Sequence, residues 1–198
     1  MIVDFLRHGT TGRHGHLDGR TDFPLTAEGH AQVSGVTKRK KWDAIVTSPL
    51  KRAKEAAEPL ARTLAVALRV DADWSEIDFG AWDGRARSEI EADVGAREAL
   101  AAFYRAEAQG ASPGGETRVD FAARIHRAIL SLAESPPRQP VLVITHAGPI
   151  RQALADVCGL PLDRLWSIRI GHATRVRLEF AIGGDGLPWG EIVEVAQP

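Results

Sequence analysis

The sequence predicts an α/β fold in which a mostly parallel sheet lies between two layers of helices (α/β/α). Two observations indicate this class. Short apolar segments typical of buried strands alternate along the chain with longer segments of helical pattern. Polar clusters directly follow several of these strands, and parallel sheets bind their ligands at that edge.

The first third of the chain contains two strand–helix units. Residues 2–6 are short and apolar, and a glycine-rich loop over residues 7–22 follows them. A helix is expected to start near Thr26. Residues 42–47 form the second expected strand. Ser48 and Pro49 then predict a helix to about residue 65, with Ser48 as N-cap and Pro49 in the first helical position.

The middle of the chain is predominantly helical. Residues 68–70 fit a short third strand, and residues 88–107 are rich in Ala, Glu and Arg, which predicts one helix. After a Pro- and Gly-rich break, Thr117 and Asp120 resemble a capping box. The helix that starts there should reach about residue 133, and two prolines, at 136 and 137, should end it.

Residues 141–144 form the clearest buried strand, and a helix over residues 149–157 is expected after it. Apolar and polar residues alternate in the tail over residues 174–195, which predicts two more strands, split by a turn at residues 183–186. We expect a single domain over residues 1–198, with a helical cover segment at about residues 85–115.

Composition excludes several classes of protein. The formal net charge of −1 disfavours a general nucleic-acid binder, and no stretch approaches the ~20 apolar residues of a membrane span. The N-terminus is too polar for a signal peptide. The single cysteine, Cys158, excludes an internal disulfide and reads as a core residue at a helix end. We expect a cytoplasmic enzyme without nucleic-acid or membrane partners; the sequence leaves its oligomeric state open.

One set of residues has the chemistry for cleaving a phosphate monoester. Guanidinium groups bind phosphate oxygens in a two-pronged geometry, and Arg7 and Arg52 could supply them. His8 could attack phosphorus, and Glu76 could give the leaving oxygen a proton. His146, if protonated, would add a positive contact.

The backbone N–H groups of Ala147 and Gly148 lie where a helix is expected to begin, which favours anion binding. His30, His126 and His172 are given no role.

These residues belong to five ordered blocks that resemble the motifs of the histidine phosphatase superfamily, which contains cofactor-dependent phosphoglycerate mutase. The blocks are LRHGTT (6–11), DFPLT (22–26) with Gly29, SPLKRA (48–53), EIDFGAWDG (76–84) and THAGPIR (145–151). The resemblance implies a phosphoglycerate mutase-like fold. It makes His8 the phosphorylated nucleophile and Glu76 the proton donor and then the base for water. Arg7, Arg52 and His146 become the phosphate clamp, and no metal or cofactor is implied.

The chain departs from the family pattern on the substrate side. Thr10 replaces a common Glu, His14 replaces a common Asn, and the loop over residues 12–19 is shortened. Ala56 and Ala147 replace a Thr and a Gly. No catalytic group is lost. We expect Thr11 and His14 to contact the substrate, together with Arg7, Arg52, Ala147 and Gly148.

The short segment over residues 85–115 favours hydrolysis over phosphoryl transfer, because water can reach the phosphohistidine when no long insert covers it. Within the small phosphatase branch, the stretch over residues 159–166 most resembles alpha-ribazole phosphatases of cobalamin biosynthesis. A sugar-phosphate phosphatase and a phosphoglycerate phosphatase or mutase are alternatives. Two readings of other classes stay open: a metal-dependent hydrolase that uses His14, His16 and Asp18, and a phospho-ligand binding protein without turnover.

Overall fold

The computed structural model describes residues 1–105, 112–134 and 140–198. These residues form a six-stranded sheet with the strand order β3-β2-β4-β1-β5-β6. The strands are β1 (Ile2–Arg7), β2 (Ala44–Thr47), β3 (Ala67–Val70), β4 (Val141–Thr145), β5 (Arg175–Ile182) and β6 (Pro188–Ala196). Strands β1 to β4 are parallel, and β5 and β6 pair antiparallel. The predicted class, a mostly parallel sheet, is confirmed.

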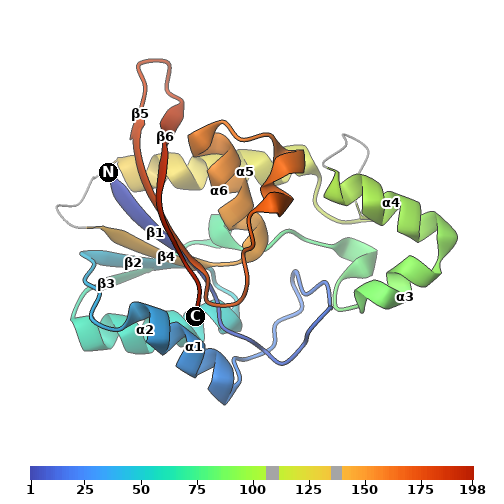
Figure 1. Ribbon diagram of the computed structural model, residues 1–198, viewed down its shortest axis with the longest axis horizontal. Coiled ribbons are helices and arrows are strands. Elements are labelled where there is room, and N and C mark those ends of the chain that lie inside the picture. Colours follow the sequence, from blue (N-terminus) through green and yellow to red (C-terminus); the bar gives the residue numbers. More distant parts are fainter. Residues whose placement is uncertain (106–111, 135–139) are drawn as a thin grey trace.

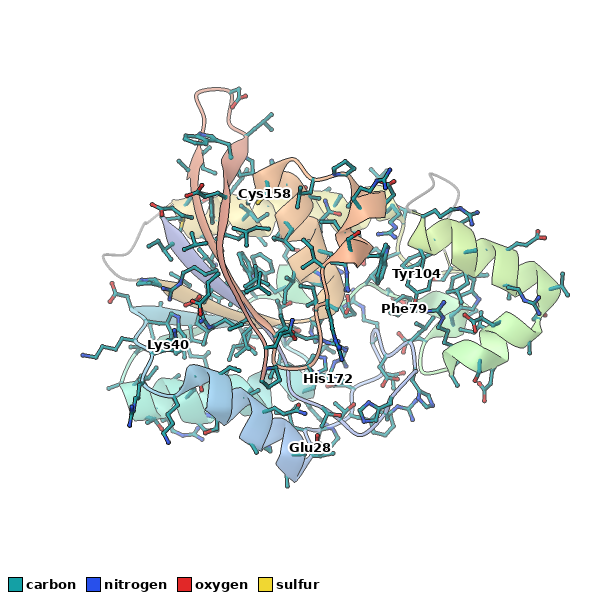
Figure 2. All side chains as sticks on the ribbon, in the orientation of Figure 1. Glu28, Lys40, Phe79, Tyr104, Cys158 and His172 are labelled. Atoms are coloured by element: carbon teal, nitrogen blue, oxygen red, sulfur yellow. The ribbon has the colours of Figure 1, made fainter. Side chains whose placement is uncertain are left out.

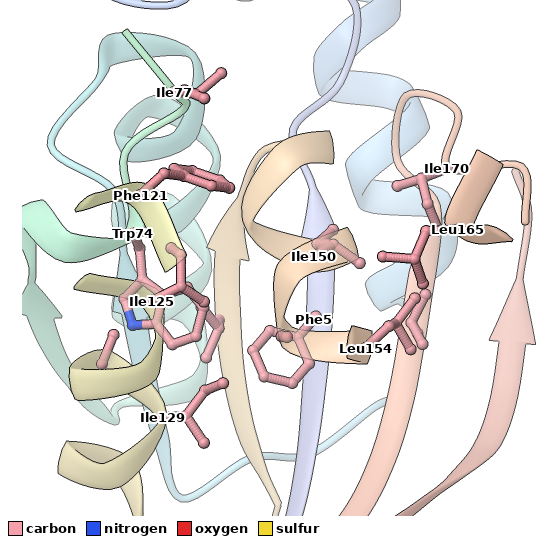
Figure 3. Close-up of a cluster of buried hydrophobic side chains, with 14 of the residues drawn as sticks. Phe5, Trp74, Ile77, Phe121, Ile125, Ile129, Ile150, Leu154, Leu165 and Ile170 are labelled. Atoms are coloured by element: carbon pink, nitrogen blue, oxygen red, sulfur yellow. The ribbon is translucent and has the colours of Figure 1, made fainter. Parts of the chain in front are cut away.

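Helices cover both faces of the sheet (Figure 1). They are α1 (Ala27–Thr37) and α2 (Lys51–Leu64) on one face, and α5 (Arg118–Ala133) and α6 (Ala147–Cys158) on the other. Successive side chains of a strand point to opposite faces, so Phe5 joins the core cluster that includes Ile125 and Leu154, whereas Leu6 joins a second cluster with Ile45. Figure 3 shows the first cluster between the sheet and α5 and α6.

The expected helix over residues 88–107 is two helices, α3 (Arg87–Ala92) and α4 (Val94–Tyr104). The prediction was wrong at Asp93, whose backbone is extended (φ −83°, ψ 122°). Its carboxylate accepts a hydrogen bond from the Ala96 N–H at 2.8 Å and so caps α4. Residues 106 and 107 lie outside the described part. Three short 3₁₀ helices complete the fold: η1 (Ala72–Trp74), η2 (Gly80–Trp82) and η3 (Leu162–Ser167).

The helix starts expected at Thr26 and Thr117 are confirmed. Thr26 and Thr117 are N-caps, and their hydroxyls accept from backbone N–H groups three residues on, at 3.0 and 3.1 Å. Ser48 is not an N-cap: α2 begins only at Lys51, because the Ser48 N–H still bonds to the neighbouring strand at Ile144 O. The helix expected over residues 149–157 begins earlier, at residue 147. The two prolines at 136 and 137 lie outside the described residues.

Cys158 ends α6 and packs against the first core cluster, near α5 (Figure 2). Burial raises the pKa of its thiol, so it stays protonated at neutral pH. Among the helices of the described residues, none is long and apolar enough to cross a membrane.

Candidate active site

Three segments that follow parallel strands meet at one edge of the sheet. His8, Ser48 and His146 follow β1, β2 and β4, and β4 lies between the other two strands. The ring centroids of His8 and His146 are 5.1 Å apart, and His146 Nε2 lies 2.8 Å from Ser48 Oγ. The convergence that the sequence predicts is therefore present.

His8 is held in the form that a nucleophile requires. Its Nδ1 lies 2.7 Å from the Gly9 carbonyl, which only accepts, so Nδ1 carries the proton and Nε2 keeps a free lone pair. The ring is 6% exposed. Burial lowers the pKa of His8 well below 6.5, and the positive charges of Arg7 and Arg52 lower it further. His8 is thus neutral at physiological pH.

Arg7 lies beside His8, and its guanidinium group is oriented by Ile170 and His172, which come just before β5. Its Nη1 donates to the Ile170 carbonyl at 2.8 Å, and its Nη2 donates to His172 Nε2 at 3.2 Å. Burial lowers the pKa of Arg7 to about 10, and that of His172 to about 4. His172 is therefore a neutral acceptor, and its ring centroid is 5.5 Å from that of His8. Sequence reasoning gave His172 no role, and only the fold places it here.

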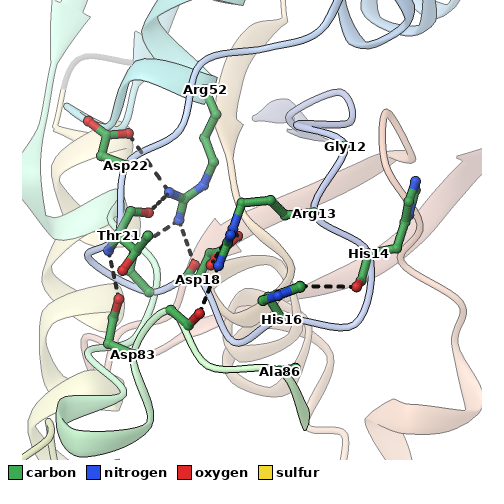
Figure 4. A network of polar contacts seen from close by, with 12 residues as sticks. Gly12, Arg13, His14, His16, Asp18, Thr21, Asp22, Arg52, Asp83 and Ala86 are labelled. Atoms are coloured by element: carbon green, nitrogen blue, oxygen red, sulfur yellow. Dashed lines mark hydrogen bonds and ion pairs between the residues drawn. The ribbon is translucent and has the colours of Figure 1, made fainter. Parts of the chain in front are cut away.

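Arg52 is 2% exposed and bonds to the loop that precedes α1 (Figure 4). Its Nη1 donates to the Thr21 carbonyl at 2.7 Å, and its Nη2 donates to the carbonyls of Asp18 and Gly19 at 2.8 and 2.9 Å. The Asp22 carboxylate is 3.8 Å from Nη1. Arg52 lines the pocket, but its strongest contacts hold the loop in place.

His146 is fully buried and neutral. Its Nδ1 accepts the Nε–H of Arg52 at 3.2 Å, so the proton is on Nε2, which donates to Ser48 Oγ. Burial lowers the pKa of His146 well below 6.5, and Arg52 and His8 lower it further. The condition for a positive contact from His146, a protonated ring, is therefore not met, and its Nε2–H is already donated to Ser48 Oγ.

Glu76 lies against the start of α6. Its Oε1 accepts from the Ile77 N–H at 3.0 Å and its Oε2 from the Gly148 N–H at 3.2 Å. The predicted anion site at this helix end is thus used by a carboxylate of the protein itself, so the Gly148 N–H is not free for substrate. Ala147, the residue before it, lines the pocket.

Arg7, His8, Arg52 and Glu76 line one pocket of about 280 Å³, close to the size of small-molecule sites, whereas the fully buried His146 is not among its lining residues. Thr11 is part of the lining, whereas the exposed side chain of His14 is not and contacts His172 at 5.9 Å between ring centroids. The lining also contains residues that were not among the expected catalytic and substrate-binding residues. They include Arg13, His16, Phe79, Phe103, Tyr104, Arg118, Phe121, Arg151, Leu162, Leu165, Trp166 and Ile170.

The residues of the metal-site alternative have other partners. Asp18 is paired with Arg13 Nε at 3.0 Å, and His16 Nδ1 lies 3.1 Å from the His14 carbonyl. Within the described ranges, no three His, Cys, Asp or Glu side chains come close enough to hold a metal ion together. The arrangement of this loop therefore does not favour a metal centre built on these residues.

Comparison with known families agrees with this geometry. The model of the histidine phosphatase superfamily (branch 1) matches residues 3–187. The chain belongs to the histidine phosphatase superfamily. The match runs from β1, before the nucleophile, to the turn before β6, and so contains every pocket residue named above.

Two curated relatives show the range of this superfamily. A glucosyl-3-phosphoglycerate phosphatase of Mycobacterium tuberculosis is 33% identical over 171 residues, which cover 79% of this chain and 75% of the relative. A Salmonella paratyphi B protein named as a probable phosphoglycerate mutase is 28% identical over 202 residues, which cover 99% of this chain and 92% of the relative. Together, the superfamily and the phosphatase at 33% identity identify the chain as a phosphatase.

Solved structures of histidine phosphatases have the same fold. A mycobacterial glucosyl-3-phosphoglycerate phosphatase superposes with a TM-score of 0.82 at 29% identity, covering 97% of this chain and 96% of that one. The alpha-ribazole phosphatase from Shigella flexneri gives a TM-score of 0.80 at 21% identity and covers 97% and 95%. At that identity the second likeness establishes the fold alone.

Proposed function

We propose that this histidine phosphatase hydrolyses a small phosphate monoester through a phosphohistidine at His8. The observation that carries the proposal is the protonation and tautomeric state of the His8 ring. Its Nδ1–H is fixed by the Gly9 carbonyl, its Nε2 is unprotonated, and its ring lies beside the Arg7 guanidinium. A neutral imidazole next to a fixed positive charge can approach a phosphorus atom that carries negative oxygens.

The first half of the reaction transfers the phosphoryl group to the enzyme. A bond forms between His8 Nε2 and phosphorus while the bond from phosphorus to the ester oxygen breaks. The leaving oxygen takes a proton from the Glu76 carboxyl group, so the alcohol departs neutral. Arg7 and the nearby charge of Arg52 stabilise the phosphoryl oxygens, and His146, whose Nε2–H is donated to Ser48 Oγ, accepts the Nε–H of Arg52 and so helps to position it.

The second half returns the enzyme to its starting state. Water attacks phosphorus and gives a proton to the Glu76 carboxylate, while the bond between phosphorus and His8 Nε2 breaks. The sum is ester plus water to alcohol plus phosphate. No metal ion takes part in either half, so the reaction should continue in the presence of EDTA.

The test compares wild type, His8→Ala and His30→Ala on p-nitrophenyl phosphate with EDTA present. His30 is exposed on α1 outside the pocket and controls for the loss of a histidine. We expect turnover by wild type and His30→Ala, none by His8→Ala, and an acid-labile phosphoryl group on the peptide that contains residue 8. Turnover by His8→Ala would overturn the assignment. Ligand binding without phosphate release by wild type would favour the non-catalytic alternative.

The substrate proposed from the sequence is alpha-ribazole 5′-phosphate, from cobalamin biosynthesis. One feature of the pocket supports it: Tyr104 and Trp166 meet edge to face with 4.7 Å between centroids and, with Phe103, could stack on a benzimidazole ring. In this proposal the protein is cytoplasmic, which the absence of a possible internal disulfide favours.

A phosphoglycerate ester is the second candidate, supported by the relative at 33% identity that is named for such a substrate. Steady-state kcat/KM on alpha-ribazole 5′-phosphate and on 3-phosphoglycerate separates the two candidates. Release of inorganic phosphate, rather than isomerised 3-phosphoglycerate, separates hydrolysis from mutase activity.

A further inference from the structure

One polar side chain of the pocket has no part in the reaction steps above: Gln152 of α6. It lines the pocket and is only 4% exposed. Among the described residues of the lining, it is the one side chain that ends in an amide. A buried amide has to satisfy both an NH₂ group and a carbonyl oxygen, so the partners of each end indicate what the residue does.

Gln152 belongs to a stripe of α6 that faces α5. Residues 148, 152 and 156 are four positions apart and therefore share one face of the helix. At the first end of the stripe, a Cβ atom at Gly148 would lie 3.3 Å from the ring of Phe121 in α5. At the other end, Asp156 Oδ2 lies 3.7 Å from Nδ1 of His126, also in α5. Gln152 is therefore held at the seam between the two helices.

Asp156 fixes which end of the Gln152 amide faces the pocket. Gln152 Nε2 donates to Asp156 Oδ1 at 2.7 Å. The other oxygen of this carboxyl group, Oδ2, has no hydrogen-bond partner in the described ranges. If the amide were turned over, its carbonyl oxygen would meet Oδ1 as acceptor against acceptor. The NH₂ group therefore stays on Asp156, and the amide oxygen Oε1 points away from it.

The Oε1 atom of Gln152 is an acceptor without a donor. No N–H or O–H group in the described part of the chain donates to it, and the pocket's Arg118 and Arg151 keep their Nε groups unpaired. Oε1 is not sealed from solvent, and the open space beside Gln152 is the pocket. An acceptor that is fixed in place and open to a pocket is suited to a donor on a ligand.

The charge of the pocket selects the kind of donor. Five arginines line it, and they disfavour an ammonium group. A carboxylate or a phosphate has no hydrogen to give to Oε1. A hydroxyl group is neutral and both donates and accepts, so it can bind Oε1 and still accept from an arginine N–H. A hydroxyl group therefore fits this position on every count.

Gln152 lies on the leaving-group side of the reaction. Glu76, which gives its proton to the ester oxygen in the proposed mechanism, accepts from the Gly148 N–H at 3.2 Å. Gln152 is one helical turn further along α6, about 6 Å from Gly148. A hydroxyl bound to Oε1 is therefore part of the alcohol and lies several bonds from the ester oxygen.

We propose that Gln152 is a specificity-determining residue whose Oε1 accepts a hydrogen bond from a hydroxyl group of the alcohol, and that Asp156 positions its amide. The substrate is then a phosphate ester that keeps a free hydroxyl, not a simple alkyl phosphate. This inference rests on the proposed function and deepens it. Both candidates carry such a hydroxyl, on the ribose of alpha-ribazole 5′-phosphate and on carbon 2 of 3-phosphoglycerate.

The experiment compares ribose 5-phosphate with n-pentyl phosphate, which has the same number of carbon atoms and no hydroxyl. Wild type should have the higher kcat/KM on ribose 5-phosphate. Gln152→Met removes the acceptor and keeps the length of the side chain. It should lower kcat/KM on ribose 5-phosphate by about fivefold to tenfold, the effect of one hydrogen bond. Turnover of n-pentyl phosphate and of p-nitrophenyl phosphate should stay within about twofold of wild type.

Two substitutions at Asp156 test whether it positions the amide. Asp156→Leu has a similar size and releases the Gln152 NH₂ group, so it should reduce the preference for ribose 5-phosphate by about threefold to tenfold. Asp156→Asn is the matched control, because it keeps an oxygen that can accept from the amide, and it should retain the preference. Equal preference in the two variants would contradict the positioning role.

Equal losses on all three esters in Gln152→Met would mean that the residue only supports the fold, which would overturn the inference while the phosphatase function stands. A wild-type kcat/KM on n-pentyl phosphate that equals or exceeds that on ribose 5-phosphate would do the same. No turnover of any of the three esters by wild type would overturn the proposed function and the inference with it.

Discussion

Gly148 donates its backbone N–H to Oε2 of Glu76, and a Cβ atom at position 148 would overlap the other oxygen of that carboxylate. Glu76, the proposed proton donor, is therefore positioned by a glycine two residues after His146. Because the Glu76 carboxylate fits against bare backbone, any side chain at residue 148 must displace it.

We expect Gly148→Ala to lower kcat by about tenfold to a hundredfold, since a misplacement of about 1 Å has effects of that size. The loss should be larger for glycerol 3-phosphate than for p-nitrophenyl phosphate, whose leaving group needs less help from an acid. Steady-state kinetics on both esters checks this. Gly35→Ala is the matched control, because a Cβ at that helical position meets nothing within 4 Å. Equal losses of kcat on both esters would contradict the displacement of the Glu76 carboxyl group.

Arg52 joins the loop before α1 to His146, so its removal should affect stability as well as turnover. Arg52→Ala leaves the carbonyls of Thr21, Asp18 and Gly19 without their donor. We expect the free energy of unfolding to fall by about 3 kcal/mol and kcat by at least about a hundredfold. Arg52→Lys should not restore either quantity, because an ammonium group cannot reproduce the fork of contacts.

Urea denaturation and turnover of p-nitrophenyl phosphate measure the two effects of the Arg52 variants. Arg62→Ala, at an exposed position of the same helix, controls for the loss of an arginine from α2. Full stability with lost turnover in Arg52→Ala would assign Arg52 to the phosphate alone.

The sequence could predict the segments of the site because of a local pattern: polar residues directly follow β1, β2 and β4. Parallel neighbouring strands end at one edge, so His8 and His146 had to meet there. The contact between Arg7 and His172 could not be predicted, because it joins residues 165 apart through the antiparallel strand β5, which has no motif.

The errors also have physical causes. Residues 88–107 are mostly good helix formers, but Asp93, Val94 and Gly95 are poor ones, and the extended backbone of Asp93 divides the segment there. Ser48 has the right residue type for an N-cap, but the sheet holds its backbone and His146 binds its hydroxyl. The charge of His146 was left open, because sequence shows neither its full burial nor the Nε–H of Arg52 that it accepts.

Asp4 lies on the face of β1 opposite to Phe5, where it anchors a buried network of ion pairs with Arg175 and Arg177. Burial alone would raise its pKa, but hydrogen bonds from Arg177, Trp42 and Arg175 lower it overall. Arg175 is 1% exposed and lies 2.5 Å from Asp4 Oδ1. We expect Asp4→Asn to lower the free energy of unfolding by about 3–5 kcal/mol, because it leaves the buried Arg175 with only the partly exposed Glu194 as counter-charge.

Thermal or urea denaturation measures the Asp4 effect, with Glu194→Gln as the matched control. Glu194 is the other carboxylate on Arg175 but is 41% exposed, so its loss should cost less than about 1 kcal/mol. Asp4 does not line the pocket, so folded Asp4→Asn should keep its KM at low temperature. Similar losses for the two variants would contradict the role of burial.

Three histidines of the candidate site, His8, His146 and His172, make stability depend on pH. The pKa of an unfolded histidine is about 6.5. In the folded protein the pKa values of His8 and His146 are well below this and that of His172 is about 4, chiefly through burial. Well above pH 6.5 these histidines are neutral in both the folded and the unfolded protein, so they cause no change of stability with pH. As pH falls below 6.5 the unfolded state takes up protons first, so the folded state loses stability.

Between pH 7.5 and 5.5 each fully shifted histidine should lower the free energy of unfolding by about 1.4 kcal/mol, with a smaller share from the partly exposed His172. Urea denaturation at the two pH values measures the total. His172→Gln should reduce the loss by about 1 kcal/mol or less, whereas His30→Gln controls for removal of a histidine outside the pocket. A total loss below about 1 kcal/mol in wild type would mean that His8 and His146 are not neutral in the folded protein, and the nucleophile would then have to lose a proton before it could attack.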